Sequence, residues 1–172
     1  MLNNPRQLMR FVLLLGTLAL LSACGFHLRQ PVPVPAELKE TRIAGIAEFA
    51  PLTLQMKKVL TSAGSTVLPA TAKAASTISI SNERYDRRVL SVDAQGRVAE
   101  YELSYSFSFN VTDAAGKQLV PGQKIQLLRD FRFDPNNVLA KDAEETQIKT
   151  EMIDFAVRQM MRRIDASFRR KP

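Results

Sequence analysis

The chain has 172 residues and a formal net charge of +7, and it contains one cysteine and one histidine. The cysteine has no intramolecular disulfide partner, and the histidine, His27, lies only three residues after it, which argues against a Ser-His-Asp or Cys-His catalytic arrangement and a histidine-rich zinc site. The positive charge could favour nucleic acid, but the sequence has no aromatic-rich RNA motif and no glycine-rich phosphate loop, so we expect no nucleic-acid partner.

The first 23 residues have the three zones of a secretory signal peptide. Arg6 and Arg10 give a positive start, residues 11–21 are almost entirely apolar, and Ser22 and Ala23 are small. The apolar run is too short for an ordinary membrane-spanning helix. We predict that residues 1–23 are a lipoprotein signal peptide that is removed, which lowers the formal net charge by two.

The residues at the end of this leader, "LSAC" at 21–24, are similar to a bacterial lipobox. In such signals the nucleophilic thiol receives a diacylglycerol, cleavage frees the cysteine amine, and that amine is acylated. One acyl chain anchors a protein only marginally, whereas three hold it almost permanently. We predict that Cys24 is the lipid attachment site, carrying S-diacylglycerol and an N-acyl chain. Gly25, rather than aspartate, is typical of lipoproteins sorted to the outer membrane.

The mature chain divides into three parts. Residues 24–40 are interpreted as the lipidated N-terminus and a stalk, because a proline at every second position of residues 31–35 favours extended, semi-rigid backbone. Residues 41–168 are predicted to form a single α+β domain. Residues 169–172 are predicted to be a basic tail.

The domain is predicted to begin with a strand over residues 41–46 and a helix that Pro51 opens and Gly64 ends. The apolar face of this helix comprises Leu52, Met56, Val59, Leu60 and Ala63.

Three strands are predicted next, over residues 76–92, 97–112 and 124–133. The first needs a bulge between Ile80 and Tyr85, where the apolar phase changes. The second alternates strictly over its whole length, so one of its faces is expected to be buried. Its apolar positions are Ala99, Tyr101, Leu103, Tyr105, Phe107, Phe109 and Val111. Turns are expected at residues 93–96 and 113–116. In the third strand Arg129 interrupts the apolar face.

A long helix is predicted to end the domain, with Asp134 as its cap, Pro135 in its first turn and its end at about Ser167. Its expected core-facing residues are Ile148, Met152, Phe155, Gln159 or Met160, and Ile164. Two amphipathic helices on one face of a four-stranded, mostly antiparallel or mixed sheet bury all these apolar faces. The predicted fold class is therefore a two-layer α+β sandwich whose other sheet face is serine-rich.

Three short segments resemble one known family: "CGFHLR" at residues 24–29, "AEY" at 99–101 and "LAKDAEE" at 139–145. Behind a lipobox, and in this order, they resemble the LPS-assembly lipoprotein LptE family over about residues 24–168. The resemblance implies a protein that is not an enzyme and needs no cofactor. It implies a lipid-anchored position at the outer membrane, on the periplasmic side and inside the lumen of the LptD β-barrel. It further implies that the protein binds lipopolysaccharide and supports assembly of the barrel.

The resemblance also implies lipopolysaccharide contacts. Lys141 matches the lysine of the family's "LAKD" motif. The family's basic residue in the turn before "AEY" has no counterpart in residues 93–96, so Arg97, Arg87 and Arg88 are the candidates to replace it. His27 belongs to the N-terminal motif, either as a structural or partner contact or as a solvated residue.

Two other functions fit the same sequence features. One is an outer-membrane lipoprotein that acts as a scaffold for another envelope protein. The other is a lipid-binding carrier with an apolar cavity.

Overall fold

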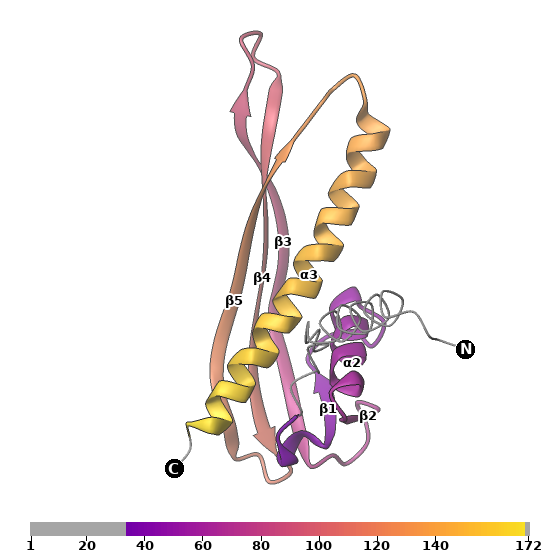
Figure 1. The fold of residues 1–172 in the computed structure, drawn as a ribbon, viewed down its shortest axis with the longest axis vertical. Helices are drawn as coiled ribbons and strands as arrows, with labels where there is room; N and C mark the ends of the chain where they lie inside the picture. The colour runs from indigo at the N-terminus through magenta and orange to yellow at the C-terminus, as the bar shows by residue number, and fades with distance from the viewer. Residues whose placement is uncertain (1–33, 171–172) are drawn as a thin grey trace, which may run out of the picture. The chain divides into compact units, whose positions relative to one another are not determined.

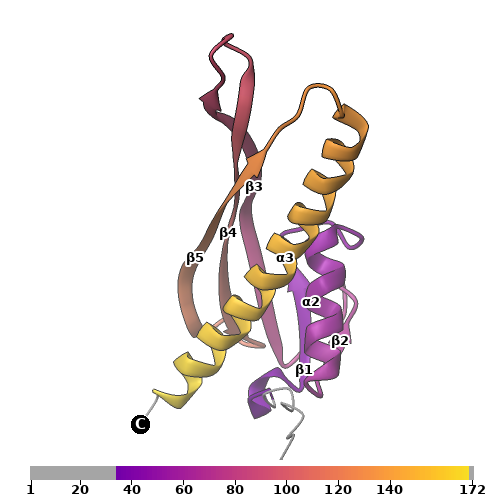
Figure 2. The same ribbon diagram turned by 45° about the horizontal axis from the view of Figure 1, so that its top comes forward.

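A computed structural model describes residues 34–170, and these form a five-stranded mixed sheet with two helices on one face (Figures 1 and 2). In chain order the elements are the 3-10 helix η1 (Ala36–Leu38), β1 (Glu40–Ala44), α2 (Pro51–Ser62), β2 (Thr66–Leu68), β3 (Ser76–Val92), β4 (Val98–Asp113), β5 (Gln118–Arg132) and α3 (Val138–Arg169). The predicted leader, Cys24 and His27 lie outside the described residues.

The sheet has one strand more than the sequence predicted. Its order is β2-β1-β3-β4-β5, with β1 parallel to both β2 and β3 and with antiparallel β3–β4 and β4–β5 pairs. The prediction of four strands was wrong because β2 has only three residues and ends before Pro69. Its pairing with β1, not its own sequence pattern, makes it a strand.

The long strand β4 supplies the centre of the core, as predicted. Its odd-numbered side chains from Leu103 to Val111 are all buried, whereas the even-numbered ones are partly exposed. The predicted bulge in β3 is confirmed by a register shift between Ser81 and Arg84. The predicted turns are confirmed as well, with Gly96 and Gly116 in the left-handed conformation that glycine adopts without steric cost.

The segment before β1 and the edge strand β5 both extend further than predicted. Leu38, ahead of β1, is already buried in the core, and the Val34 backbone N–H donates to the Ala63 carbonyl. The packed region therefore begins before residue 41. Strand β5 begins at Gln118 rather than at 124, because an edge strand accommodates Pro121 and Gly122 in a register shift opposite Phe109–Val111.

Helix α2 begins at Pro51 and ends ahead of Gly64, as predicted, but α3 begins four residues later than the predicted cap. The Asp134 carboxylate accepts a hydrogen bond from the Asn136 backbone N–H, and the Asn137 N–H donates to the Asp134 carbonyl. Asp134 and Pro135 thus form a turn that precedes the helix. Aspartate and proline suit the first positions of a turn as well as those of a helix, so the sequence alone favoured the wrong one.

Phe155 is also misplaced by the prediction, since 41% of it is exposed. The buried positions of α3 are Met152, Ile153, Ala156, Val157, Met160 and Ile164. They follow mainly the four-residue spacing, which leaves Phe155 outside the covered stripe. Its ring lies instead beneath the guanidinium groups of Arg158 and Arg162.

The orientation of β4 can be tested by two neighbouring substitutions. Phe107 is 0% exposed, so Phe107→Ala should lower the free energy of unfolding by about 3–5 kcal/mol. Ser106→Ala, on the opposite face, should change it by less than about 0.5 kcal/mol. Chemical denaturation of both variants measures the difference, and equal effects would contradict the assigned orientation.

Candidate functional site

The candidate site lies between the first half of α3 and the half of the sheet that leads to the β3–β4 turn, beside which that part of the helix runs (Figure 1). None of residues 138–151 of the helix is buried, although the helix runs along the sheet. At the four-residue spacing of the covered stripe, this half carries Lys141, Glu145 and Lys149. Charged side chains therefore take the place of most of the apolar ones that attach the second half, and only near residue 151 does the partly buried Ile148 still pack against the core.

These charged side chains contact aromatic rings of the sheet. The Lys141 ammonium lies 5.6 Å from the centre of the Phe131 ring, and the Lys149 ammonium lies 4.7 Å from the centre of the Tyr85 ring. Cation–π contacts of this kind are attractive where water is partly excluded. We call the four rings on this side, Tyr85, Tyr101, Phe131 and Phe133, the aromatic seam.

Glu145 joins the helix to β3. The Arg87 Nη1 donates to its Oε2 at 2.7 Å, and the Tyr85 hydroxyl donates to its Oε1 at 2.9 Å. The hydrogen bond with Glu145 raises the pKa of Arg87, and burial together with the same carboxylate raises the pKa of Tyr85. Arg87 therefore stays charged and Tyr85 stays protonated under ordinary conditions.

Two of the predicted basic residues come together at this seam. The Arg87 guanidinium lies 4.6 Å from the centre of the Tyr101 ring, and Tyr101 is the cross-strand neighbour of Phe131, over which Lys141 lies. Lys141 also pairs with Glu144 at 2.7 Å. Arg87 and Lys141, 54 positions apart along the chain, thus lie with Glu144 and Glu145 on one surface that carries aromatic rings.

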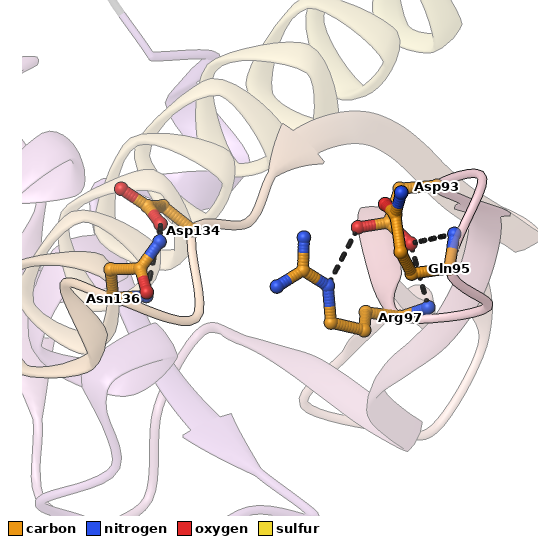
Figure 3. A network of polar contacts seen from close by, with 5 residues as sticks. All are labelled: Asp93, Gln95, Arg97, Asp134 and Asn136. Carbon is orange, nitrogen blue, oxygen red and sulfur yellow. Dashed lines mark hydrogen bonds and ion pairs between the residues drawn. The ribbon is translucent and has the colours of Figure 1, made fainter.

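The other two candidates lie elsewhere. Arg88 follows Arg87 in β3 and therefore projects from the opposite sheet face, where it pairs with Glu102 at 2.7 Å. Arg97 lies in the β3–β4 turn, where its Nε donates to Asp93 Oδ2 at 2.8 Å (Figure 3). Arg97 is fixed to its own turn, at the end of the seam rather than within it.

The sequence analysis missed Glu145, Tyr85 and Tyr101 as site residues. Tyr85 and Tyr101 were assigned to strands, and Glu145 was assigned to the "LAKDAEE" segment on a solvated helix face. The spacing of Lys141, Glu145 and Lys149 was visible as one helical stripe. That stripe could have indicated a charged face, but not the rings that it contacts.

Exposed apolar side chains flank the seam at the β3–β4 end. They are Val89 and Val92 of β3 and Val138 and Leu139 of α3. Elsewhere, a hollow of about 310 Å³ lies between α2 and α3 and has mostly polar lining residues, including Gln55, which donates to Asp154. It contains none of the four basic candidates. Within residues 34–170, no helix is both long and apolar enough to span a lipid bilayer.

The fold is that of small bacterial lipoproteins of known structure. The chain is similar to the structure of lipoprotein B from Nitrosomonas europaea, with a TM-score of 0.66 and 29% identity over 80% of this chain and 88% of that one. It also resembles the rare lipoprotein B from Shewanella oneidensis in fold, with a TM-score of 0.64 and 24% identity over 74% and 94% of the two chains.

The chain belongs to the LptE lipopolysaccharide-assembly family, whose model matches residues 40–164. It is 31% identical to the LPS-assembly lipoprotein LptE of Photorhabdus laumondii, over 88% of this chain and 83% of that protein. It is 30% identical to the LptE of Pectobacterium atrosepticum, over 90% and 84%. The family resemblance inferred from the three short segments is thereby confirmed.

The geometry of the turn predicts how Asp93 titrates. The backbone N–H of Arg97, the Arg97 side chain and the backbone N–H of Gln95 all donate to its carboxylate and hold the pKa of Asp93 below its ordinary value of 3.8. The stabilisation is present above the ordinary pKa and is lost as the pH falls through the lowered one.

In an NMR titration, Arg97→Ala should raise the pKa of Asp93 only in part, because the backbone N–H of residue 97 is the larger cause and remains. Arg88→Ala, which removes the same charge from the opposite sheet face, serves as the control. An Asp93 that titrates at 3.8 or above in the unsubstituted protein would contradict this account of the turn.

Proposed function

We propose that this chain is the lipoprotein subunit of the outer-membrane lipopolysaccharide translocon. In this role it plugs the lumen of an LptD-like β-barrel, binds lipopolysaccharide and supports assembly of the barrel. The observation that carries the proposal is membership of the LptE family over residues 40–164. The sequence of the leader and the surfaces of the domain support its separate parts.

The leader supports the anchor. The lipobox at residues 21–24 is the basis for proposing acylation of Cys24 and a position at the outer membrane, on its periplasmic side. Three acyl chains give an effectively permanent attachment. The protein thereby needs no membrane-spanning segment of its own to stay at the barrel.

The uncovered face of the sheet supports the plug. This face carries short polar side chains at Ser79, Ser81, Ser104, Ser106, Ser108 and Asn110. The interior of an outer-membrane barrel is polar, so a largely polar sheet face suits that surrounding better than an apolar one would. A chain held in the lumen would in turn limit collapse of the barrel during its assembly.

The aromatic seam supports the lipopolysaccharide site. Lipopolysaccharide carries phosphate groups next to acyl chains, and lysine and arginine bind phosphate through charge-assisted hydrogen bonds. Lys141 and Arg87 supply such donors on one surface, with exposed Leu139 and Val89 nearby in the same half of the domain. Arg97 at the end of the seam is a further contact. Because Arg88 lies on the other sheet face, Arg87 is favoured over it as the substitute for the basic residue that the family has in the turn before "AEY".

Co-purification tests the proposed function. Extracted in mild detergent with its native membranes, the full-length protein should copurify with one large β-barrel protein in about equal amounts, and its N-terminal residue should have the mass of a triacylated Cys24. Recovery of the protein with lipid but without a barrel would favour the carrier instead. Recovery with a different envelope protein would favour the scaffold.

Lipopolysaccharide binding should depend on Lys141. Lys141→Gln should weaken binding by about tenfold at low salt, which corresponds to one charge-assisted hydrogen bond of about 1.5 kcal/mol. The loss should shrink at high salt because screening already weakens the attraction.

Lys117→Gln removes the same charge from the β4–β5 turn and is the matched control. Binding of purified lipopolysaccharide to both variants, together with their melting temperatures, separates loss of contact from loss of folding. Equal affinities for the two variants would exclude Lys141 from the site.

A further inference from the structure

We propose that Glu144 and Glu145 are built-in competitors of the ligand's phosphate groups, holding Lys141 and Arg87 in a closed state that binds lipopolysaccharide less tightly. The inference rests on the proposed function, because it concerns the same site. It goes further by assigning two acidic residues a role that opposes binding, and by coupling the ligand to the position of the first half of α3.

Both cations pair with carboxylates of the chain itself. Arg87 directs Nη1 to Glu145 and lies over the Tyr101 ring, and Lys141 pairs with Glu144 while lying over the Phe131 ring. A phosphate oxygen needs the same N–H donors as these carboxylates. A ligand therefore has to displace at least part of one ion pair before it gains the full contact.

The ion pair at Glu145 is shielded enough to resist displacement. The Glu145 side chain is 16% exposed, and it accepts two hydrogen bonds, from Arg87 and Tyr85. The Lys141 side chain is 20% exposed, whereas that of its partner Glu144 is 50% exposed. Partly buried charges are screened less than exposed ones, so Glu145 is expected to be the stronger competitor of the two.

The same contacts help attach the first half of α3 to the sheet. With no buried residue in 138–151, this segment is held by the Glu145 bonds, by the cation–π contacts of Lys141 and Lys149, and near its end by the partly buried Ile148. The second half is held by the core. Segments with few buried apolar contacts open at a lower free-energy cost than the rest of a domain.

Displacement of Glu145 would loosen this half-helix and widen access to the half-buried rings of Tyr101 and Phe133. Val89, the cross-strand neighbour of Tyr101, is exposed, as is Leu139 in the first turn of α3. A ligand that can contact both the basic side chains and these apolar surfaces is an amphiphile with phosphate groups and acyl chains. Coupling between two equilibria is reciprocal, so removing the carboxylates should favour both helix opening and ligand binding.

The experiment compares Glu145→Gln, Glu144→Gln and the double variant with Glu102→Gln. The control changes the net charge as much as each single variant does, but it frees Arg88, on the opposite sheet face. The probe is purified lipopolysaccharide, with a dephosphorylated form as a second ligand, bound to the full-length protein in detergent. Hydrogen exchange over residues 138–149 measures opening of the half-helix.

The double variant should bind lipopolysaccharide about three- to tenfold more tightly than the unsubstituted protein, and Glu145→Gln should account for most of the gain. The gain should vanish with the dephosphorylated ligand. Exchange over residues 138–149 should be faster in Glu145→Gln and unchanged in Glu102→Gln.

If the unsubstituted protein binds lipopolysaccharide but Glu145→Gln and Glu144→Gln bind it no more tightly, the proposed competition is wrong. The proposed function would not be affected by that result. An equal gain in Glu102→Gln would overturn the competition too, since net charge would then explain the effect. An unsubstituted protein that binds no lipopolysaccharide would refute ligand binding in the proposed function as well. Glu144→Gln keeps the test valid if Glu145→Gln does not fold, because Glu144 pairs only along the helix surface.

Discussion

Burial of one face of β4 is the constraint on which the rest of the structure depends. From Leu103 to Val111 every second side chain is excluded from solvent, between the neighbouring strands and the two helices. A shift of register by one residue would turn all of these side chains outward, so this face fixes the pairing of β3 and β5. It also fixes which side of the sheet α2 and the second half of α3 cover, and hence leaves the serine-rich side uncovered.

Toward the β3–β4 turn, the contacts of this face change from apolar to polar, and the candidate site lies where they change. Beyond Leu103 the strand continues with Tyr101, whose ring meets Arg87 and the edge of Phe133 instead of an aliphatic helix residue. The helix above offers Lys141 and Glu145 at this level. One continuous helix therefore has two different attachments: an apolar one along its second half, and a largely polar one along its first half.

The sequence allowed the long strands, both helices, the β3 bulge and the turns to be predicted, because each leaves a periodic or compositional mark within a few neighbouring residues. Strand β2 leaves none, since three residues are too few for a pattern. Asp134 fits a turn and a cap equally, which moved the predicted start of α3. The pairing of Glu145 with Arg87 and Tyr85 joins positions about 60 residues apart. Only the register of the sheet and the placement of α3 bring them together.

The motif identified Lys141 as a candidate contact, but it says nothing of affinity, which on the proposal above depends also on the neighbouring carboxylates. A subunit that passes lipid through a transport machine has to release its ligand as well as accept it, and each additional unopposed cation would slow that release. Carboxylates placed beside the cations lower the gain from binding phosphate without removing the donors that recognise it. On the proposed function, Glu144 and Glu145 of the "LAKDAEE" segment are thus part of the site. Their ion pairs with Lys141 and Arg87 form again when the lipid is released.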